Sequence, residues 1–140
     1  MKYFLLTSFF LLLAPFVAFA DIDEHVVRAK EHCDTMVITA NVALFNGGQG
    51  KIAVVVRSFK KVVQEAETCL KHIQNALNDK DTNRNIQKEG GKAVEFLKEA
   101  IRDATVAIAE GEDGSARIIM TYARKAWKNA KEGNRHAQEM

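Results

Sequence analysis

Apolar residues recur three and four positions apart over four stretches of the chain, the spacing of one face of an α-helix. The main rows of the first two stretches are Ile22, Val26, Ala29, Cys33, Met36, Ala40 and Ala43, then Ile52, Val56, Phe59, Val63, Ala66, Leu70, Ile73 and Leu77. Beside the second row runs another, Val55, Val62, Cys69 and Ala76. The many valines there would suit a strand, but no period-two alternation accompanies them. The pattern therefore predicts two helices, the second apolar over a wide arc.

Two further rows follow a polar segment at residues 78–85, which has the composition of a linker. These rows are Val94, Leu97, Ile101, Ala104 and Ile108, then Ala116, Ile119, Ala123, Ala126 and Ala130 beside Met120 and Trp127. The one proline of the chain is Pro15, so no proline interrupts these helices. The sequence predicts an all-α fold of four helices, with a frayed tail from Gly133 onward.

Two glycine-containing segments, Asn46–Lys51 and Ala109–Arg117, lie where one apolar row stops and the next begins. Glycine is the preferred residue just past a helix end, and a short connection makes its two helices antiparallel neighbours. Their first glycines are 64 positions apart, and the same offset relates further identical residues: Ala29 and Ala93, Ala40 and Ala104, Val42 and Val106, Ala43 and Ala107, Ala66 and Ala130. We therefore predict an up-down-up-down four-helix bundle made of two duplicated αα-hairpins.

The first 20 residues have the features of a secretory signal peptide. Lys2 supplies a basic start, an apolar run follows, and Ala18-Phe19-Ala20 is a small-x-small cleavage site. The alternative is a retained anchor, for which the apolar stretch is marginal in length. We expect cleavage before Asp21. The predicted organisation is a signal peptide at 1–20 and a bundle at 21–140, divided into hairpin one at 21–78, a linker at 79–91, hairpin two at 92–132 and a tail at 133–140.

Charge excludes one class of partner. The whole chain has 20 basic and 18 acidic residues, and Lys2 lies in the signal peptide, so the mature chain is nearly neutral. Nucleic-acid binding would need a basic face. We expect a monomer in the periplasm or secreted, with no membrane contact after signal cleavage. No nucleophile, base and orienting group occur together in a recognisable arrangement, so no enzymatic activity is expected.

The run AIAEGEDG at residues 107–114, followed by YARKA at residues 122–126, resembles the small metal-binding protein family of bacterial periplasms. Members of that family have a signal peptide and a four-helix bundle whose helices carry motifs of the form AIxHGEEGH and KHAQEAIEH. The resemblance is clearest between residues 92 and 132. It implies reversible binding of divalent metals, copper most prominently, by histidines on the helix surfaces.

The histidine positions of those motifs are not occupied by histidine here. The matching residues are Asn46, Lys51, Glu110, Ser115, Tyr122 and Asn129, and none of them offers an imidazole. No ligand of the family therefore carries over, and any metal site has to be sought among this chain's own residues.

Both cysteines and three of the four histidines lie in the first predicted hairpin. The candidate ligands are His25, His32, Cys33, Cys69 and His72. Cys69 and His72 are three apart, hence on one helical face, and thiolate with imidazole suits copper or zinc. Met36, one turn beyond Cys33, would add a thioether to a soft copper site. The remaining histidine, His136, falls in the predicted tail and suggests nothing.

The register of the first hairpin leaves two alternatives open. If Asn46 faces Lys51 across the turn, Cys33 lies about 7 Å along the axis from the level of Cys69, which strains a disulfide. Paired cysteines are nevertheless common in exported proteins, and a disulfide would remove both sulfur ligands. The same register sets His72 level with His25, and Glu65 level with His32. A two-histidine surface site is therefore the alternative to a thiolate site, and solvated histidines beside a buried Cys33 are the simplest reading.

Two other features have plain structural explanations. The run from Asp79 to Asn83 imitates the start of a calcium loop, but Arg84 and Gly90 stand where that loop needs glycine and glutamate. Tyr122 and Trp127, at helical spacing, are expected to pack rather than to bind. The sequence thus predicts a small exported protein that buffers or scavenges copper or zinc, with a non-metal bundle that docks a periplasmic protein as the alternative.

Overall fold

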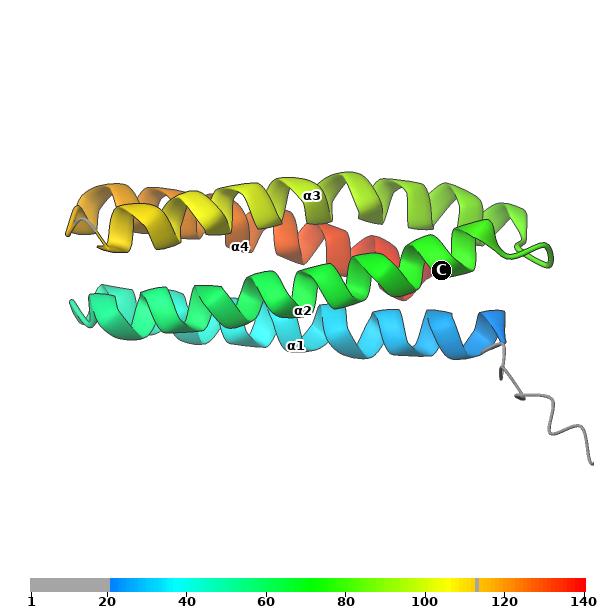
Figure 1. The fold of residues 1–140 in the computed structure, drawn as a ribbon, viewed down its shortest axis with the longest axis horizontal. Helices are drawn as coiled ribbons and strands as arrows, with labels where there is room; N and C mark the ends of the chain where they lie inside the picture. The colour runs from blue at the N-terminus through cyan, green and yellow to red at the C-terminus, as the bar shows by residue number, and fades with distance from the viewer. Residues whose placement is uncertain (1–20, 113) are drawn as a thin grey trace, which may run out of the picture.

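The computed structural model describes residues 21–112 and 114–140, and the predicted signal peptide lies outside this range. The helices are α1 (Ile22–Gly48), α2 (Ile52–Asn78), α3 (Arg84–Glu112) and α4 (Ala116–Glu139). No strand occurs in the described part of the chain. Figure 1 shows the pair α1 and α2 lying against the pair α3 and α4, with each helix antiparallel to the next in sequence. The predicted all-α four-helix bundle is confirmed.

The core follows the predicted rows, with a shift in α2 and another in α3. In α3, Val94, Ile101 and Ile108 of the predicted row are half-buried, whereas the neighbouring Ala93, Ala100 and Ala107 are buried. In α2 the fully buried side chains include Val55, Val62 and Cys69 from the further row, whereas Val63 and Leu70 of the main row are half-buried. The reason is that α2 packs against α1 on one side and α3 on the other, so the centre of its buried arc falls between the two rows. Many of the remaining core residues are alanine: Ala29, Ala40, Ala43, Ala66, Ala93, Ala100, Ala104, Ala107, Ala123, Ala126, Ala130 and Ala137.

The two hairpin turns have matching closing hydrogen bonds at an offset of 64 residues. The amide of Lys51 donates to the carbonyl of Asn46, and the amide of Ser115 donates to the carbonyl of Glu110. Gly50 and Gly114, which complete the turns, have φ values of +74° and +84°, a region that favours glycine. The duplication suggested by the offset stays a prediction.

The predicted linker at 79–91 is too long, because α3 begins at Arg84. Asn83 starts the helix, since its side-chain oxygen accepts a hydrogen bond from the amide of Ile86 at 2.9 Å. Gly90 does not interrupt the helix. A Cβ atom there would lie 3.1 Å from Leu77 and 3.3 Å from Ile73, so the glycine lets α3 approach α2.

The predicted frayed tail is also wrong, because α4 continues to Glu139. Gly133 is buried in its close contact with Leu97 of α3. At the end of the helix, the side-chain amide of Asn85 donates to the carbonyl of Glu139 at 2.7 Å. Glycine at residue 133 therefore marks a close helix crossing and not a helix end.

Candidate metal-binding site

Three histidines and one carboxylate lie together along the seam between α1 and α2. His25 and His72 face each other with 3.0 Å between their Nδ1 atoms, and His32 Nδ1 lies 2.7 Å from Glu65 Oε2. These are the two pairs that the register predicted. All four side chains are half-buried, so solvent reaches them from the outside of the bundle.

The His25 and His72 nitrogens have a separation that suits a shared ion. Two imidazole nitrogens bound to one zinc at about 2.0 to 2.1 Å stand roughly 3.3 Å apart in a tetrahedron. The ring of His32 stacks on that of His72, with 5.8 Å between centroids and 6° between planes. Among the described residues, no third ligand atom joins this pair within 4.8 Å. The resting site is therefore a two-nitrogen pair with a third imidazole beside it.

The environment of His72 favours the neutral ring that binds metals. Partial burial, followed by the neighbouring His25 and His32, lowers the pKa of His72. The contact between the two Nδ1 atoms requires that one donates a hydrogen and the other accepts it. One facing nitrogen is therefore unprotonated and its lone pair accepts the hydrogen of the other, so an ion bound by both nitrogens would have to displace that hydrogen.

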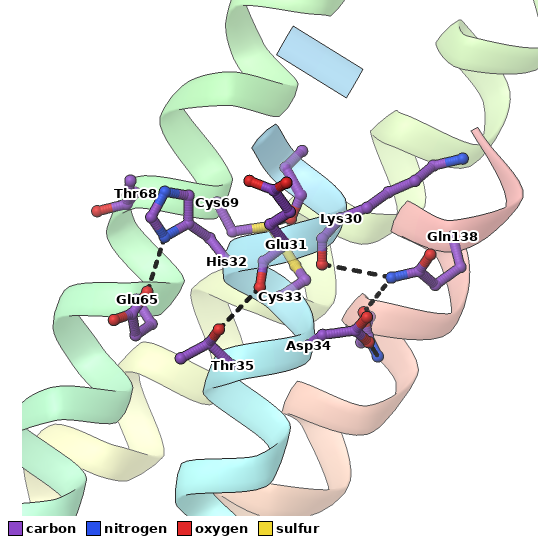
Figure 2. Close-up of a disulfide and its surroundings, with 12 residues drawn as sticks. Lys30, Glu31, His32, Cys33, Asp34, Thr35, Glu65, Thr68, Cys69 and Gln138 are labelled. Carbon is purple, nitrogen blue, oxygen red and sulfur yellow. Dashed lines mark hydrogen bonds and ion pairs between the residues drawn. A yellow bond between two sulfur atoms is a disulfide. The ribbon is translucent and has the colours of Figure 1, made fainter. Parts of the chain in front are cut away.

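Glu65 orients His32. A carboxylate that hydrogen-bonds one ring nitrogen of a histidine fixes the ring and makes the other nitrogen the metal-binding one. Figure 2 shows His32 on α1 turned toward Glu65 on α2, with the dashed line marking this contact. Of the two side chains, 33% of His32 and 17% of Glu65 is exposed, so water can compete for this contact and His32 can leave it more readily than a core residue could.

Sulfur takes no part in the site. Cys33 and Cys69 form a disulfide with 5.6 Å between their Cα atoms (Figure 2), and both residues are fully buried. Met36 is fully buried as well. Of the alternatives that the sequence left open, the disulfide is the one present, so Cys33 and Cys69 are not available as ligands.

The disulfide forms without the axial offset estimated from the turn. Helices α1 and α2 have 27 residues each and are joined by three residues, so residue 33 of α1 lies level with residue 67 of α2. Cys69 is then about 3 Å away along the axis. Side chains lean toward the N-terminus of their own helix, which in an antiparallel pair closes this remaining gap.

A second cluster, between α3 and α4, was not expected. Glu89 on α3 and His136 and Glu139 on α4 have ligand atoms within 4.8 Å of one another. Only 4% of Glu89 and 5% of His136 is exposed. The offset of 64 could have located this cluster, because it relates His25 to Glu89 and His72 to His136. The sequence did not indicate the cluster, because Glu89 falls in the predicted linker and His136 in the predicted tail.

The charges around this second cluster are already paired. Lys88 Nζ lies 2.9 Å and Lys92 Nζ 3.5 Å from Glu89 Oε1. Hydrogen bonds from Lys88 and then His136 lower the pKa of Glu89 to about 2. The guanidinium of Arg135 donates to His136 Nε2 at 2.7 Å, so Nδ1 carries the ring hydrogen and donates it to Glu89 at 2.7 Å. Neither ring nitrogen keeps a free lone pair, and the cluster acts as a structural clamp.

The remaining sequence candidates have structural roles. The Asp79 carboxylate accepts the amide of Asp81 at 2.9 Å, which makes a turn of the calcium-like run. Met120, Tyr122 and Trp127 are partly buried and pack against the core, as the helical spacing predicted.

Comparisons with protein-family models, with curated proteins and with solved structures find no match for this chain. In the part of the chain that the structure describes, no helix combines the length and apolar character needed to cross a bilayer.

Proposed function

We propose that this protein is a small, exported, non-catalytic metal-binding protein that holds a divalent ion, copper or zinc, between His25 and His72. The observation that carries the proposal is the 3.0 Å separation of their Nδ1 atoms on a solvent-reachable seam. His32, stacked on His72, is the third ligand when its ring reorients. Such a site, with few ligands of its own and open positions, suits reversible buffering or scavenging.

The chemistry of the donors supports a borderline divalent ion. With both cysteines in the disulfide and Met36 buried, the site offers nitrogen atoms and, at the nearby Glu65, carboxylate oxygen. Imidazole suits zinc, copper and nickel in their divalent states, whereas copper(I) selects thiolate and thioether. The family resemblance of the sequence points in the same direction.

Export is supported by two features. The first 20 residues have the pattern of a signal peptide. The Cys33–Cys69 disulfide is of the kind that persists in oxidising compartments such as the periplasm.

Calorimetric titration of residues 21–140, the whole bundle, with Cu²⁺ and then Zn²⁺ tests the proposal. We expect saturable binding that is lost in a His25→Gln, His72→Gln double variant. A Glu24→Gln, Lys71→Gln variant, changed at exposed positions one residue before each histidine, is the matched control and should bind as the parent does. Absence of heat with both ions, or equal affinity in the histidine variant, would exclude this function.

A further inference from the structure

The outer surface of α1 carries large apolar side chains that nothing in the bundle covers. Ile38, Val42 and Phe45, the outer stripe, have exposed fractions of 64%, 49% and 69%. Their spacing of four and then three residues places them on one face of the helix. Ala40 and Ala43, which are fully buried, lie on the opposite face. The second half of α1 is therefore apolar on both its inner and its outer side.

Charge is absent from this part of the helix. No Asp, Glu, Lys or Arg occurs from residue 35 to residue 50. The corresponding positions of α3, at the offset of 64, are Arg102, Val106 and Ala109, so hairpin two replaces two of the three large apolar groups with a charged and a small one. A helix on the surface of a bundle normally has a polar outer face, so an apolar outer stripe is unusual, and contiguous exposed apolar groups mark interaction surfaces.

We propose that a second copy of this chain covers the outer stripe. Two α1 helices pack antiparallel about a twofold axis near Val42, with Phe45 of each copy against Ile38 of the other. Anchors at spacings of three and four residues fit the face of another helix. A twofold interface brings a surface against itself, and an uncharged surface can meet itself without like-charge repulsion. This dimer departs from the monomer predicted above and does not depend on the metal site.

Charge complementarity at the edges of the stripe supports the same register. With Phe45 opposite Ile38 of the second copy, the turn that carries Lys51 lies opposite the part of the second α1 that carries Glu31. Lys51 and Glu31 are both exposed. In the described ranges neither forms an ion pair. The twofold axis makes this pair twice, once at each end of the interface. An anionic membrane is a poorer occupant, because the stripe has no basic residues beside it on α1 from residue 31 onward.

Sedimentation equilibrium of residues 21–140, from micromolar to millimolar concentration and with EDTA present to exclude metal bridging, tests the dimer. The parent chain should pass from monomer to dimer, and Phe45→Glu should remain monomeric with an unchanged helical circular dichroism spectrum. Ala109→Glu, the exposed equivalent on α3, is the matched control and should dimerise as the parent does.

The charge pair gives a test that leaves the apolar stripe intact. Lys51→Glu and Glu31→Lys should each weaken dimerisation by roughly two- to tenfold, and the double exchange should restore it. A parent chain that stays monomeric at every concentration would overturn the proposal, as would a dimer indifferent to Phe45→Glu. Flotation of a monomeric chain with neutral phosphatidylcholine vesicles, abolished by Phe45→Glu, would assign the stripe to a lipid surface instead.

Discussion

Glu89 and His136 meet 2.7 Å apart across α3 and α4, at the place where His25 and His72 meet across α1 and α2. Both contacts join residues 47 apart in sequence. Between α3 and α4, Lys88 also binds Glu89 and Arg135 also binds His136. Among the described residues, no lysine or arginine binds the facing nitrogens of His25 and His72 in this way. The same position of a hairpin therefore holds a buried hydrogen bond between a histidine and a carboxylate in one half of the bundle and a candidate metal site in the other.

The buried pair predicts a specific acid sensitivity. The pKa of Glu89 is lowered to about 2 from its ordinary 4.5, so the stability it contributes is complete above about 4.5 and is lost as pH falls toward 2. Glu89→Gln should lower the urea midpoint at pH 7 and flatten its fall over that window. Glu95→Gln, at an exposed site of the same helix, should leave the profile unchanged. An unaltered profile in Glu89→Gln would contradict the assignment.

His72 predicts a second pH effect at a higher range. Its pKa lies below the ordinary 6.5 because of burial, His25 and His32. Above 6.5 both the folded and the unfolded chain hold the neutral ring. Below 6.5 the unfolded chain binds the proton first, so stability falls as pH drops through this range. In metal-free buffer, His72→Gln should reduce the difference in urea midpoint between pH 7.5 and pH 5.5, and an equal difference in both proteins would contradict the prediction.

Two adjacent glycines of α3 should respond oppositely to alanine. A Cβ atom at Gly91 meets nothing within 4 Å, so Gly91→Ala should stabilise the protein by about 0.5 to 1 kcal/mol through helix propensity. A Cβ atom at Gly90 would lie 3.1 to 3.3 Å from Leu77, Met140 and Ile73. Crowding there should cost about 1 to 3 kcal/mol, which leaves Gly90→Ala clearly below Gly91→Ala in denaturant midpoint. The reverse order would disprove the close approach of α3 and α2.

The sequence allowed the cysteines either to form a disulfide or to bind a metal, and the disulfide leaves them only the stabilising role. It closes a separation of 36 residues, so Cys33→Ala, Cys69→Ala should lose about 3 to 4 kcal/mol of stability by the chain-entropy model. Metal affinity at a temperature where the variant is folded should stay close to that of the parent, because no sulfur is a ligand. Loss of metal binding in the folded variant would show that the proposed site depends on the cysteines.

Side chains of α2 are buried to different extents, so truncating them to alanine should reduce the stability of the protein by different amounts. Phe59 is fully buried, whereas Leu70 is half-buried beside the core. Phe59→Ala should cost about 3 to 5 kcal/mol, and Leu70→Ala should cost less, near the lower end of the roughly 2 to 5 kcal/mol expected for a core leucine. Thermal denaturation of the two variants side by side measures the order, and a larger loss for Leu70→Ala would place the centre of the core elsewhere.

The elements that the sequence predicted correctly were those fixed by local rules. The helical rows follow from spacing alone, and the turn at Gly50 follows from the preference of glycine for positive φ. The approach of His25 to His72 follows from counting outward from that turn. Each of these depends on residues close together in sequence, or on a single short turn.

Long-range packing decided the rest. Gly90 and Gly133 have the composition of helix ends, but they serve as contact points for Ile73 and Leu97, which no local pattern shows. His136 was assigned to a tail because its partner Glu89 is 47 residues away. The sequence does not decide the disulfide, because a difference of three residues in register separates a strained bond from a relaxed one.

The disulfide also bears on how an ion would leave the protein. Cys33 and Cys69 join α1 to α2 beside His32 and Glu65 (Figure 2), whereas the described part of the chain has no disulfide between the two hairpins. When the hairpins part in a local opening of the bundle, His25 and His72 stay tethered to each other. An ion held in the proposed site would therefore leave by ligand exchange at the imidazoles, and an opening between the hairpins would not by itself separate its two ligands.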